Sequence, residues 1–204
     1  MKALFYLSLS LLALSARGAT ETTDSELYVV NPPAFRETHH QDLRVIGGYD
    51  FSNPYVHSFS LGAGVYRQVI PLVALGVEAN VFRSEKRSTT KEMENKLKEY
   101  GYNVDFLAPQ WSTTGAVRIT PFSALMNLTE GRYTLAELAI VLRAGVVDYG
   151  DAGFSPIGGA AVEFNMGFDA TWGMTTAIVF NASAPKDRPT ETWMGFRAGP
   201  VIHF

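Results

Sequence analysis

The stretch that decides the fold is Arg197-Ala198-Gly199-Pro200-Val201-Ile202-His203-Phe204. Ile202 and Phe204 share one side of an extended chain, because successive side chains of a β-strand point to opposite faces. The other side holds Arg197, Gly199 and His203. This alternation predicts a strand that ends on an aromatic residue. A soluble β-protein can also end in this way, so the rest of the chain must distinguish a soluble protein from a membrane protein.

Eight segments of the chain have the composition and alternation of β-strands. Most are close to the roughly nine to eleven residues that a tilted membrane strand needs. We therefore predict an all-β fold, an eight-stranded antiparallel transmembrane β-barrel arranged as an up-and-down meander over residues 42–204. The predicted strands are residues 42–51, 57–66, 72–82, 110–120, 134–149, 157–166, 170–181 and 192–204.

The two faces of these strands differ consistently in polarity. In residues 72–82, Leu75 and Val77 share an apolar face, whereas Glu78 and Asn80 share the opposite one. A water-exposed face normally carries several lysines, yet every lysine after residue 20 falls in a predicted loop. The polar faces hold small residues, Asn and four basic and four acidic side chains. These charged residues are Arg44, Asp50, Glu78, Arg118, Glu137, Arg143, Glu163 and Arg197.

Such a balanced set of arginines and carboxylates suits a narrow enclosed lumen, where the opposite charges pair and neutralise one another. The alternative is a soluble barrel with the apolar face inside and these charges scattered on its surface. We favour the inverted barrel, whose apolar face contacts lipid. Aromatic residues near the strand ends also predict two interfacial belts. We assign Tyr49, Phe51, Trp111, Tyr149 and Phe180 to the outer belt, and Phe122, Tyr133, Phe164, Phe168, Trp172 and Phe204 to the periplasmic belt.

The beginning of the chain predicts export. Lys2 is followed by an apolar run and then by small residues, which is the order of a secretory signal peptide, assigned to residues 1–19. Residues 20–41 are expected to form a periplasmic N-terminal segment. The chain has no cysteine, which excludes disulfides and thiolate metal sites. Its net charge of -3 and its lack of a basic cluster argue against nucleic acid as a partner.

The C-terminal stretch resembles the insertion signal of bacterial outer-membrane barrels. Arg197, Gly199, Ile202 and Phe204 fill its polar, glycine, apolar and terminal aromatic places. With the strand count and the charged interior, residues 42–204 resemble small outer-membrane barrels of the OmpA transmembrane-domain type. The resemblance implies a Gram-negative outer-membrane location, contact with outer-membrane lipid and assembly by the barrel assembly machinery.

A narrower resemblance rests on the first third of the chain. Leu27-Tyr28-Val29-Val30, Gly47-Gly48-Tyr49 and Asn53-Pro54-Tyr55-Val56 are similar to an uncharacterised outer-membrane β-barrel domain family of myxobacteria and related predatory bacteria. That resemblance implies no catalytic residues.

Three segments depart from a simple barrel. Residues 84–109 contain a predicted helix, with Thr89 and Glu92 as a capping box and Gly101 at its end. This helix could bind an extracellular partner or simply pack on the barrel rim. Residues 121–132 are long for a periplasmic turn and are expected to form a short interfacial helix. Pro200 lacks an N–H in the closing strand and predicts a bulge or a position near the interface.

Candidate sites for chemistry are few, and we predict no catalytic residue, cofactor or metal. His39 and His40 could bind a metal, but neighbouring side chains of an extended segment point in opposite directions. His57 and Ser60 are the remaining candidates for a lipid-modifying enzyme, without an acidic residue placed to orient the histidine. The favoured hypothesis is a non-enzymatic barrel that stabilises the envelope or docks a periplasmic or surface partner. A small, porin-like pore or transport barrel is the alternative.

The terminal aromatic residue provides a test. Deletion of Phe204 is expected to lower outer-membrane abundance far more than deletion of Leu97 from the predicted loop helix, because the assembly machinery reads the terminal strand. Burial of a Phe side chain contributes only about 1.5–3 kcal/mol, so any inserted fraction should remain folded. Fractionation and immunoblotting measure this difference. Normal abundance of the Phe204 deletion would contradict the assignment.

Overall fold

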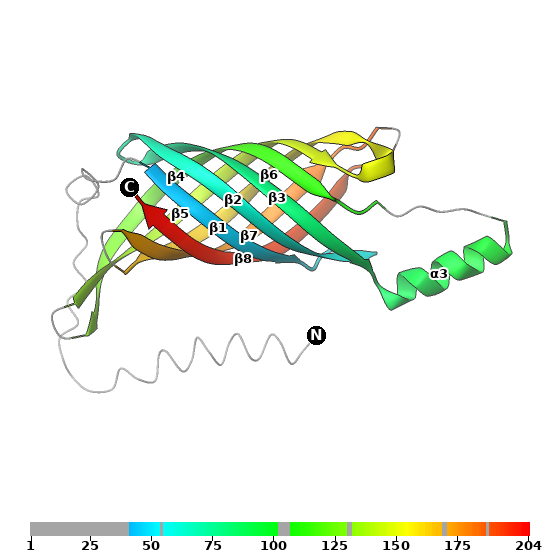
Figure 1. Ribbon diagram of the computed structural model, residues 1–204, viewed down its shortest axis with the longest axis horizontal. Helices are drawn as coiled ribbons and strands as arrows, with labels where there is room; N and C mark the ends of the chain where they lie inside the picture. The colour runs from blue at the N-terminus through cyan, green and yellow to red at the C-terminus, as the bar shows by residue number, and fades with distance from the viewer. Residues whose placement is uncertain (1–40, 54, 102–106, 130–131, 169–170, 187) are drawn as a thin grey trace.

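In the computed structural model, the chain forms a closed barrel in which each strand pairs with the next and β8 pairs with β1 (Figure 1). The structure describes residues 41–53, 55–101, 107–129, 132–168, 171–186 and 188–204. The strands are β1 (Gln41–Asp50), β2 (Val56–Ile70), β3 (Val73–Lys86), β4 (Trp111–Thr129), β5 (Arg132–Asp148), β6 (Phe154–Gly167), β7 (Trp172–Ser183) and β8 (Glu191–His203). The predicted antiparallel eight-stranded meander is confirmed.

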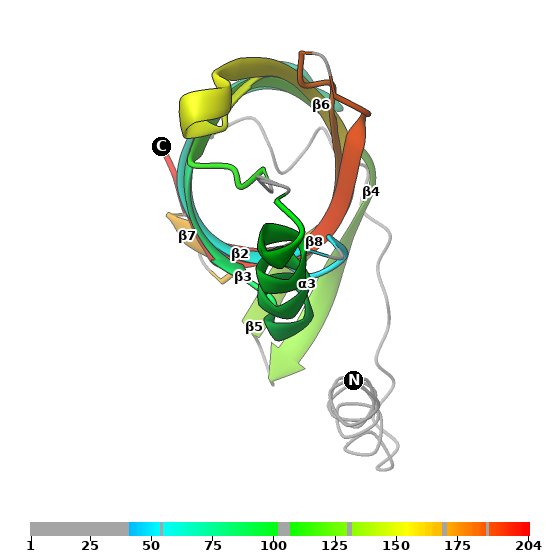
Figure 2. The same cartoon turned by 90° about the vertical axis from the view of Figure 1, so that its right-hand side faces the viewer.

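The strands tilt around a single lumen, which Figure 2 shows end-on. One end carries the β1–β2, β3–β4, β5–β6 and β7–β8 connections, and we call it the loop end. The other end carries the start of β1 and the end of β8, and we call it the terminal end. There the Gln41 N–H donates to the Phe204 carbonyl at 3.2 Å and the Phe204 N–H donates to the Gln41 carbonyl at 3.0 Å. Backbone hydrogen bonds therefore join the two ends of the described barrel.

The predicted interfacial helix in residues 121–132 is wrong. This segment extends β4 and β5, which pair from Phe122 with Leu138 to Thr129 with Arg132. The register shifts between Ile119 and Phe122, so Pro121, which has no N–H to donate, lies at an irregularity of the ladder. The apolar residues have helical spacing, but pairing with β5 satisfies the backbone better than one isolated turn of helix.

The loop helix exists, but its predicted cap does not. Helix α3 (Ser88–Glu99) begins after Arg87, which makes no side-chain capping bond, and Thr89 and Glu92 do not form the expected pair. Gly101 adopts φ of 82°, a left-handed conformation that suits glycine, just beyond the helix end. The helix projects away from the barrel instead of packing along its rim (Figure 1). A short 3-10 helix, η1 (Gly150–Ala152), turns the chain between β5 and β6.

Pro200 does not create a bulge. The β1–β8 pairs on either side of it, Arg44 with Val201 and Gly47 with Ala198, keep the same register, and the ladder is interrupted only between them. Gly199 lies in this gap, where an added Cβ would clash with the carbonyl oxygen of Val45. Gly199 therefore allows the close approach of the first and last strands.

The seam between β1 and β8 generates a stability prediction. Gly199→Ala should destabilise the barrel by about 1–3 kcal/mol, because the new methyl group would meet backbone that cannot rotate away. Gly47→Ala is the matched control, since Gly47 lies on the same seam and its Cβ would be 3.8 Å from the nearest atom, the Ala198 carbonyl oxygen. The temperature at which each variant loses the faster gel migration of the folded barrel measures the difference in stability. Equal melting of the two variants would refute the steric role.

Candidate functional site: a charge network inside the barrel

The barrel is inverted relative to a soluble protein, with its apolar face outside. Leu61 and Val81 on the outer wall are 65% and 66% exposed. By contrast, Arg44 and Glu163 are each 1% exposed. The eight predicted lumen charges are all buried on the interior face: Arg44, Asp50, Glu78, Arg118, Glu137, Arg143, Glu163 and Arg197.

Glu163 on β6 lies at the centre of the network. One of its oxygens, Oε2, is 2.7 Å from Arg44 Nη1 and 3.7 Å from Arg118 Nε. The other oxygen, Oε1, accepts a hydrogen bond from Arg143 Nη2 at 3.2 Å. One carboxylate thus contacts three guanidinium groups that come from β1, β4 and β5.

Glu78 on β3 forms a second centre. Its carboxylate lies 2.8 Å from Arg143 Nε and 3.8 Å from Arg197 Nη1. The Tyr66 hydroxyl donates a hydrogen bond to the other Glu78 oxygen, and the centroid of the Tyr66 ring lies 4.4 Å from the Arg44 guanidinium. Arg143 therefore bridges the Glu78 and Glu163 centres. Tyr66 also links them, because its hydroxyl binds Glu78 and its ring contacts Arg44, which pairs with Glu163.

The third part of the network lies toward the terminal end. Arg118 donates to Glu137 at 2.6 Å and lies 3.6 Å from Asp42. Asp42 is also 3.5 Å from Arg44 and 2.8 Å from His203 Nδ1. Together the three parts connect side chains from β1 to β6 and from β8 across the lumen.

Asp42, Tyr66 and His203 are members of the network that the sequence analysis missed. Asp42 precedes Arg44 by two residues and so shares its face, which was a usable signal. Tyr66 gave a weaker signal, because an aromatic residue at a strand end also suits an interfacial belt. Its ring fits inside because Gly76 lies beside it: an added Cβ there would be 2.5 Å from the ring.

Asp50 is positioned differently from the other seven charges. Its carboxylate is buried near the loop end, and neither oxygen has a hydrogen-bond partner among the described residues. Arg197 is the charged residue that interacts with it electrostatically, without forming an ion pair in the part of the chain that the structure describes. Asp50 is thus a buried charge between the network and the loop end, and it forms no hydrogen bond with the described side chains of the network.

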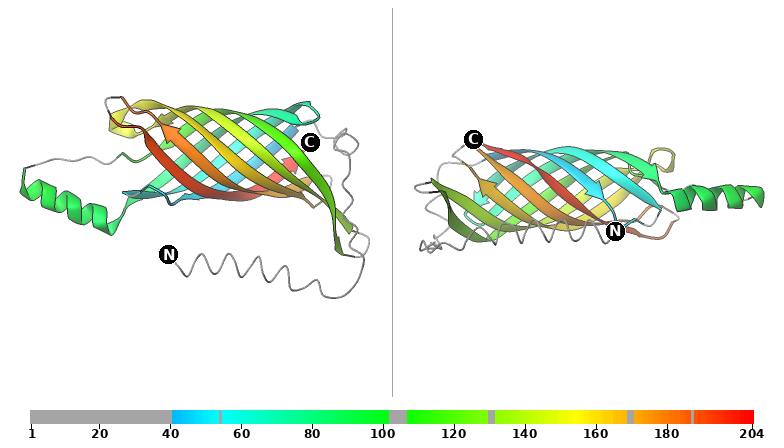
Figure 3. Two further views of the ribbon diagram at one scale, coloured as in Figure 1. Left: turned by 180° about the vertical axis from the view of Figure 1, so that it is seen from behind. Right: turned by 90° about the horizontal axis from the view of Figure 1, so that it is seen from below.

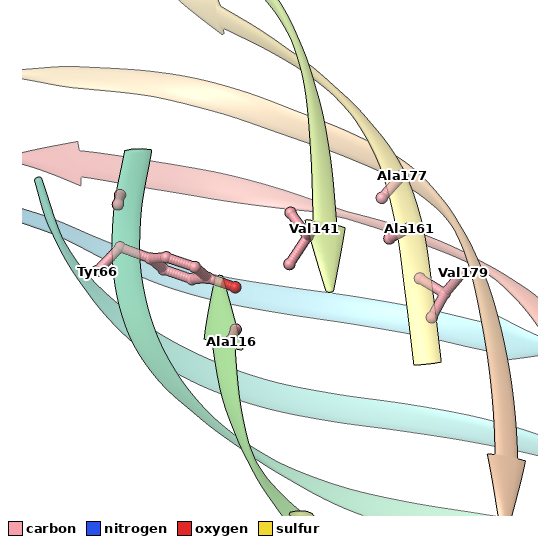
Figure 4. Packing of buried hydrophobic residues seen from close by; sticks show 7 residues of the cluster. Tyr66, Ala116, Val141, Ala161, Ala177 and Val179 are labelled. Atoms are coloured by element: carbon pink, nitrogen blue, oxygen red, sulfur yellow. The ribbon is translucent and has the colours of Figure 1, made fainter. Parts of the chain in front are cut away.

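Two apolar clusters accompany the charges inside the barrel. Tyr66 and small residues form one of them, with Ala116, Val141, Ala161 and Val179 pointing into the lumen (Figure 4). The other lies at the loop end and comprises Leu107, Val147, Tyr149, Ile157 and Trp193. The prediction of Tyr149 as a belt residue is wrong, because its side chain is buried in this cluster, and burial raises its pKa to about 12.

The remaining predicted belt residues that the structure describes are exposed on the outer wall. Tyr49 contacts Phe59 and Phe51 near the loop end, with ring centroids 4.9 and 6.5 Å apart. At the terminal end, Phe168 and Trp172 have centroids 4.8 Å apart. Trp111 and Phe180 near the loop end, and Phe122, Phe164 and Phe204 near the terminal end, are also exposed. The Tyr133 side chain is outside the described part of the chain.

The predicted C-terminal signal residues divide between the two faces of β8. Ile202 and Phe204 are 46% and 57% exposed on the outer wall. Arg197 is buried in the lumen near Glu78, and Gly199 lies at the seam with β1. Two of the four residues therefore have a structural role inside the finished barrel.

The candidate enzyme pair is not assembled. Ser60 is buried on the interior face of β2, whereas His57 is on the opposite face, 3.9 Å from Glu85. His39 and His40 fall outside the described residues. In the described part of the chain, no cluster of three or more His, Asp or Glu side chains is arranged to hold a metal ion.

The base of helix α3 is tied to the β1–β2 loop. Arg87 Nη2 donates to the Phe51 carbonyl at 2.7 Å, and Thr90 Oγ1 donates to the Tyr55 carbonyl at 2.8 Å. Lys86, the last residue of β3, donates a hydrogen bond from Nζ to the Glu94 carboxylate in α3 at 2.9 Å. This hydrogen bond lowers the pKa of the Glu94 carboxyl. The base of the helix is therefore anchored to the β1–β2 loop.

Comparisons with known proteins do not identify a family. No protein-family model matches the chain, and no curated protein matches it. Among solved structures it is similar to one described as "De novo design of transmembrane beta-barrels", with 10% sequence identity and a TM-score of 0.39. That alignment covers 81% of this chain and 96% of the other. No helix in the described ranges is long and apolar enough to span a membrane.

The central carboxylate provides a test of the network. Glu163→Gln should destabilise the barrel by about 3–5 kcal/mol, because three buried arginines would lose a shared counter-charge. Glu85→Gln is the control: Glu85 is exposed, and its loss should change stability by less than about 0.5 kcal/mol. Urea-dependent unfolding in lipid vesicles, followed by tryptophan fluorescence, measures both. Similar midpoints would show that the network does not stabilise the fold.

Proposed function

We propose that this protein is an integral outer-membrane β-barrel with a structural role and a lumen closed by charge pairs. The observation that carries the proposal is the inverted polarity of the wall: a continuous apolar exterior surrounds buried arginines and carboxylates. Such an exterior would aggregate in water, whereas lipid is a matching solvent for it. The exposed aromatic side chains near both ends suit the two membrane interfaces.

The signal-like N-terminus and the C-terminal pattern support the outer membrane as the location. Residues 1–19 have the order of an export signal, and the terminal strand resembles the one that the barrel assembly machinery reads. In this orientation the terminal end faces the periplasm. Helix α3, which projects beyond the loop end of the barrel (Figure 1), then extends into the extracellular medium, where a surface partner could bind it.

A structural role follows from the interior. Opposite charges from β1, β3, β4, β5, β6 and β8 meet across the lumen and cross-brace the wall. An eight-stranded barrel is just wide enough for side chains to fill. We therefore propose a non-enzymatic protein that stabilises the envelope or displays its loops for partners.

A small pore is the second candidate, because interior glycines leave parts of the wall without side chains. Gly62, Gly64, Gly159 and Gly195 lie on the interior face of their strands. Water and small ions would pass only if the charge pairs separated. Conductance therefore distinguishes the two candidates.

In planar bilayers the intact protein is expected to show no steady conductance. Arg143→Ala should raise conductance, because it removes the side chain that bridges Glu78 and Glu163 across the lumen. Glu137→Ala should have a smaller effect, since its ion pair with Arg118 lies toward the terminal end of the network. Glu85→Ala, outside the lumen, is the control. Large open-channel conductance of the intact protein would replace the structural role with the pore.

A further inference from the structure

Strand β4 continues well beyond its partner β3. The last β3–β4 pair joins Val73 to Ile119, and the last bond across this boundary runs from the Thr120 N–H to the Leu72 carbonyl at 2.9 Å. From residue 121 onward β4 pairs with β5 on one side, and no strand among the described residues pairs with its other side. The β4–β5 hairpin projects past the neighbouring strands at the terminal end (Figures 1 and 3).

This edge lacks the features that normally protect an unpaired strand. Exposed edges are usually short, or they carry charges that discourage another strand from pairing. Residues 121–129 contain no charged side chain. Phe122 is 67% exposed and Met126 is 36% exposed. Among the described residues, the edge therefore presents backbone donors and acceptors that pair with no strand, beside apolar side chains, and this is the surface that an added strand binds.

The sequence before β1 contains a segment suited to this edge. Leu27-Tyr28-Val29-Val30 is apolar and rich in β-branched and aromatic residues, and Pro32 and Pro33 end any strand soon after it. Because β1 starts at the terminal end, the chain enters the barrel at the end where the β4 edge projects.

The connecting chain is long enough and enters from a suitable direction. Eleven residue steps separate Val30 from Gln41, which span at most about 36–40 Å. The β4 edge lies three strands from β1, or about 15 Å around the wall. A segment antiparallel to β4 would run toward the barrel and stop near the β2–β3 turn, from which residues 31–40 can return to β1.

We propose that residues 27–30 bind the free edge of β4 at residues 121–126 as an additional antiparallel strand outside the closed ring. This strand would cover the apolar edge and hold the N-terminal segment against the barrel. The inference rests on strand pairing at the terminal end, so it stands whether the lumen is closed or conducts.

Engineered cysteines test the pairing, because the chain has none of its own. In the full chain, Val29→Cys is combined with Met126→Cys on the free edge. The matched control combines Val29→Cys with Met166→Cys, since Met166 is near the terminal end of β6, which is paired on both sides. Leu27→Cys and Tyr28→Cys are tested in the same two combinations to cover the alternative registers. At least one position should form an intrachain disulfide with Met126→Cys in about ten-fold higher yield than with Met166→Cys.

Amide hydrogen exchange provides the second measurement. In the intact chain, the edge amides of residues 122–126 should exchange about ten-fold more slowly than in Val29→Pro, which removes a donor from the added strand. Heat-modifiability shows that the barrel of this variant remains folded. Equal exchange in both chains, with equal disulfide yields at all three positions, would overturn the proposal. Disulfides formed only between two chains would also overturn it and assign the edge to a second copy.

Discussion

Closure of the backbone ladder between β1 and β8 is the constraint on which the rest of the structure depends. In the membrane setting that we propose, lipid would offer no hydrogen bonds, so the sheet would have to satisfy its own donors and acceptors all the way around. The chain meets this requirement with its first and last described strands, which exchange bonds between Gln41 and Phe204. Pro200 removes a donor from this seam, and Gly199 permits the close backbone approach beside it. The C-terminal pattern is thus also a requirement of the closed structure.

Closure produces a narrow interior, and that interior determines the choice of charged residues. Desolvating an ion is costly unless opposite charges and hydrogen bonds surround it. Arginine meets this condition better than lysine, because its planar group can donate to several carboxylate oxygens at once. Arg143 contacts both Glu78 and Glu163, and Glu163 in turn contacts three arginines. The absence of lysine from the predicted strand faces is therefore a signature of this enclosed interior that the sequence alone carries.

Strand alternation predicted the fold well, because a period of two residues leaves little ambiguity when one face is apolar and the other carries charges. It also placed Glu78, Glu163 and the other lumen charges on the correct face. Pairing within the lumen could not be predicted, because it depends on how far each strand is offset around the ring. Segments whose structure depends on distant partners were missed for a similar reason. Residues 121–129 have helical spacing of apolar residues, yet they form a strand because β5 pairs with them. Thr89 does not cap the helix, whose base is instead held by hydrogen bonds from Arg87 and Thr90 to the β1–β2 loop.

The anchoring of helix α3 has a mechanical consequence. Arg87 holds the Phe51 carbonyl, and the Phe51 N–H donates in turn to the Met194 carbonyl on β8 at 3.0 Å. A continuous chain of hydrogen bonds therefore runs from the base of the helix, through the β1–β2 loop, to the last strand of the sheet. A pull on the outer half of α3 would be transmitted to the loop end of the boundary between β8 and β1, several residues from the interruption beside Pro200. The helix is thus mechanically coupled to the strand pair that closes the ring.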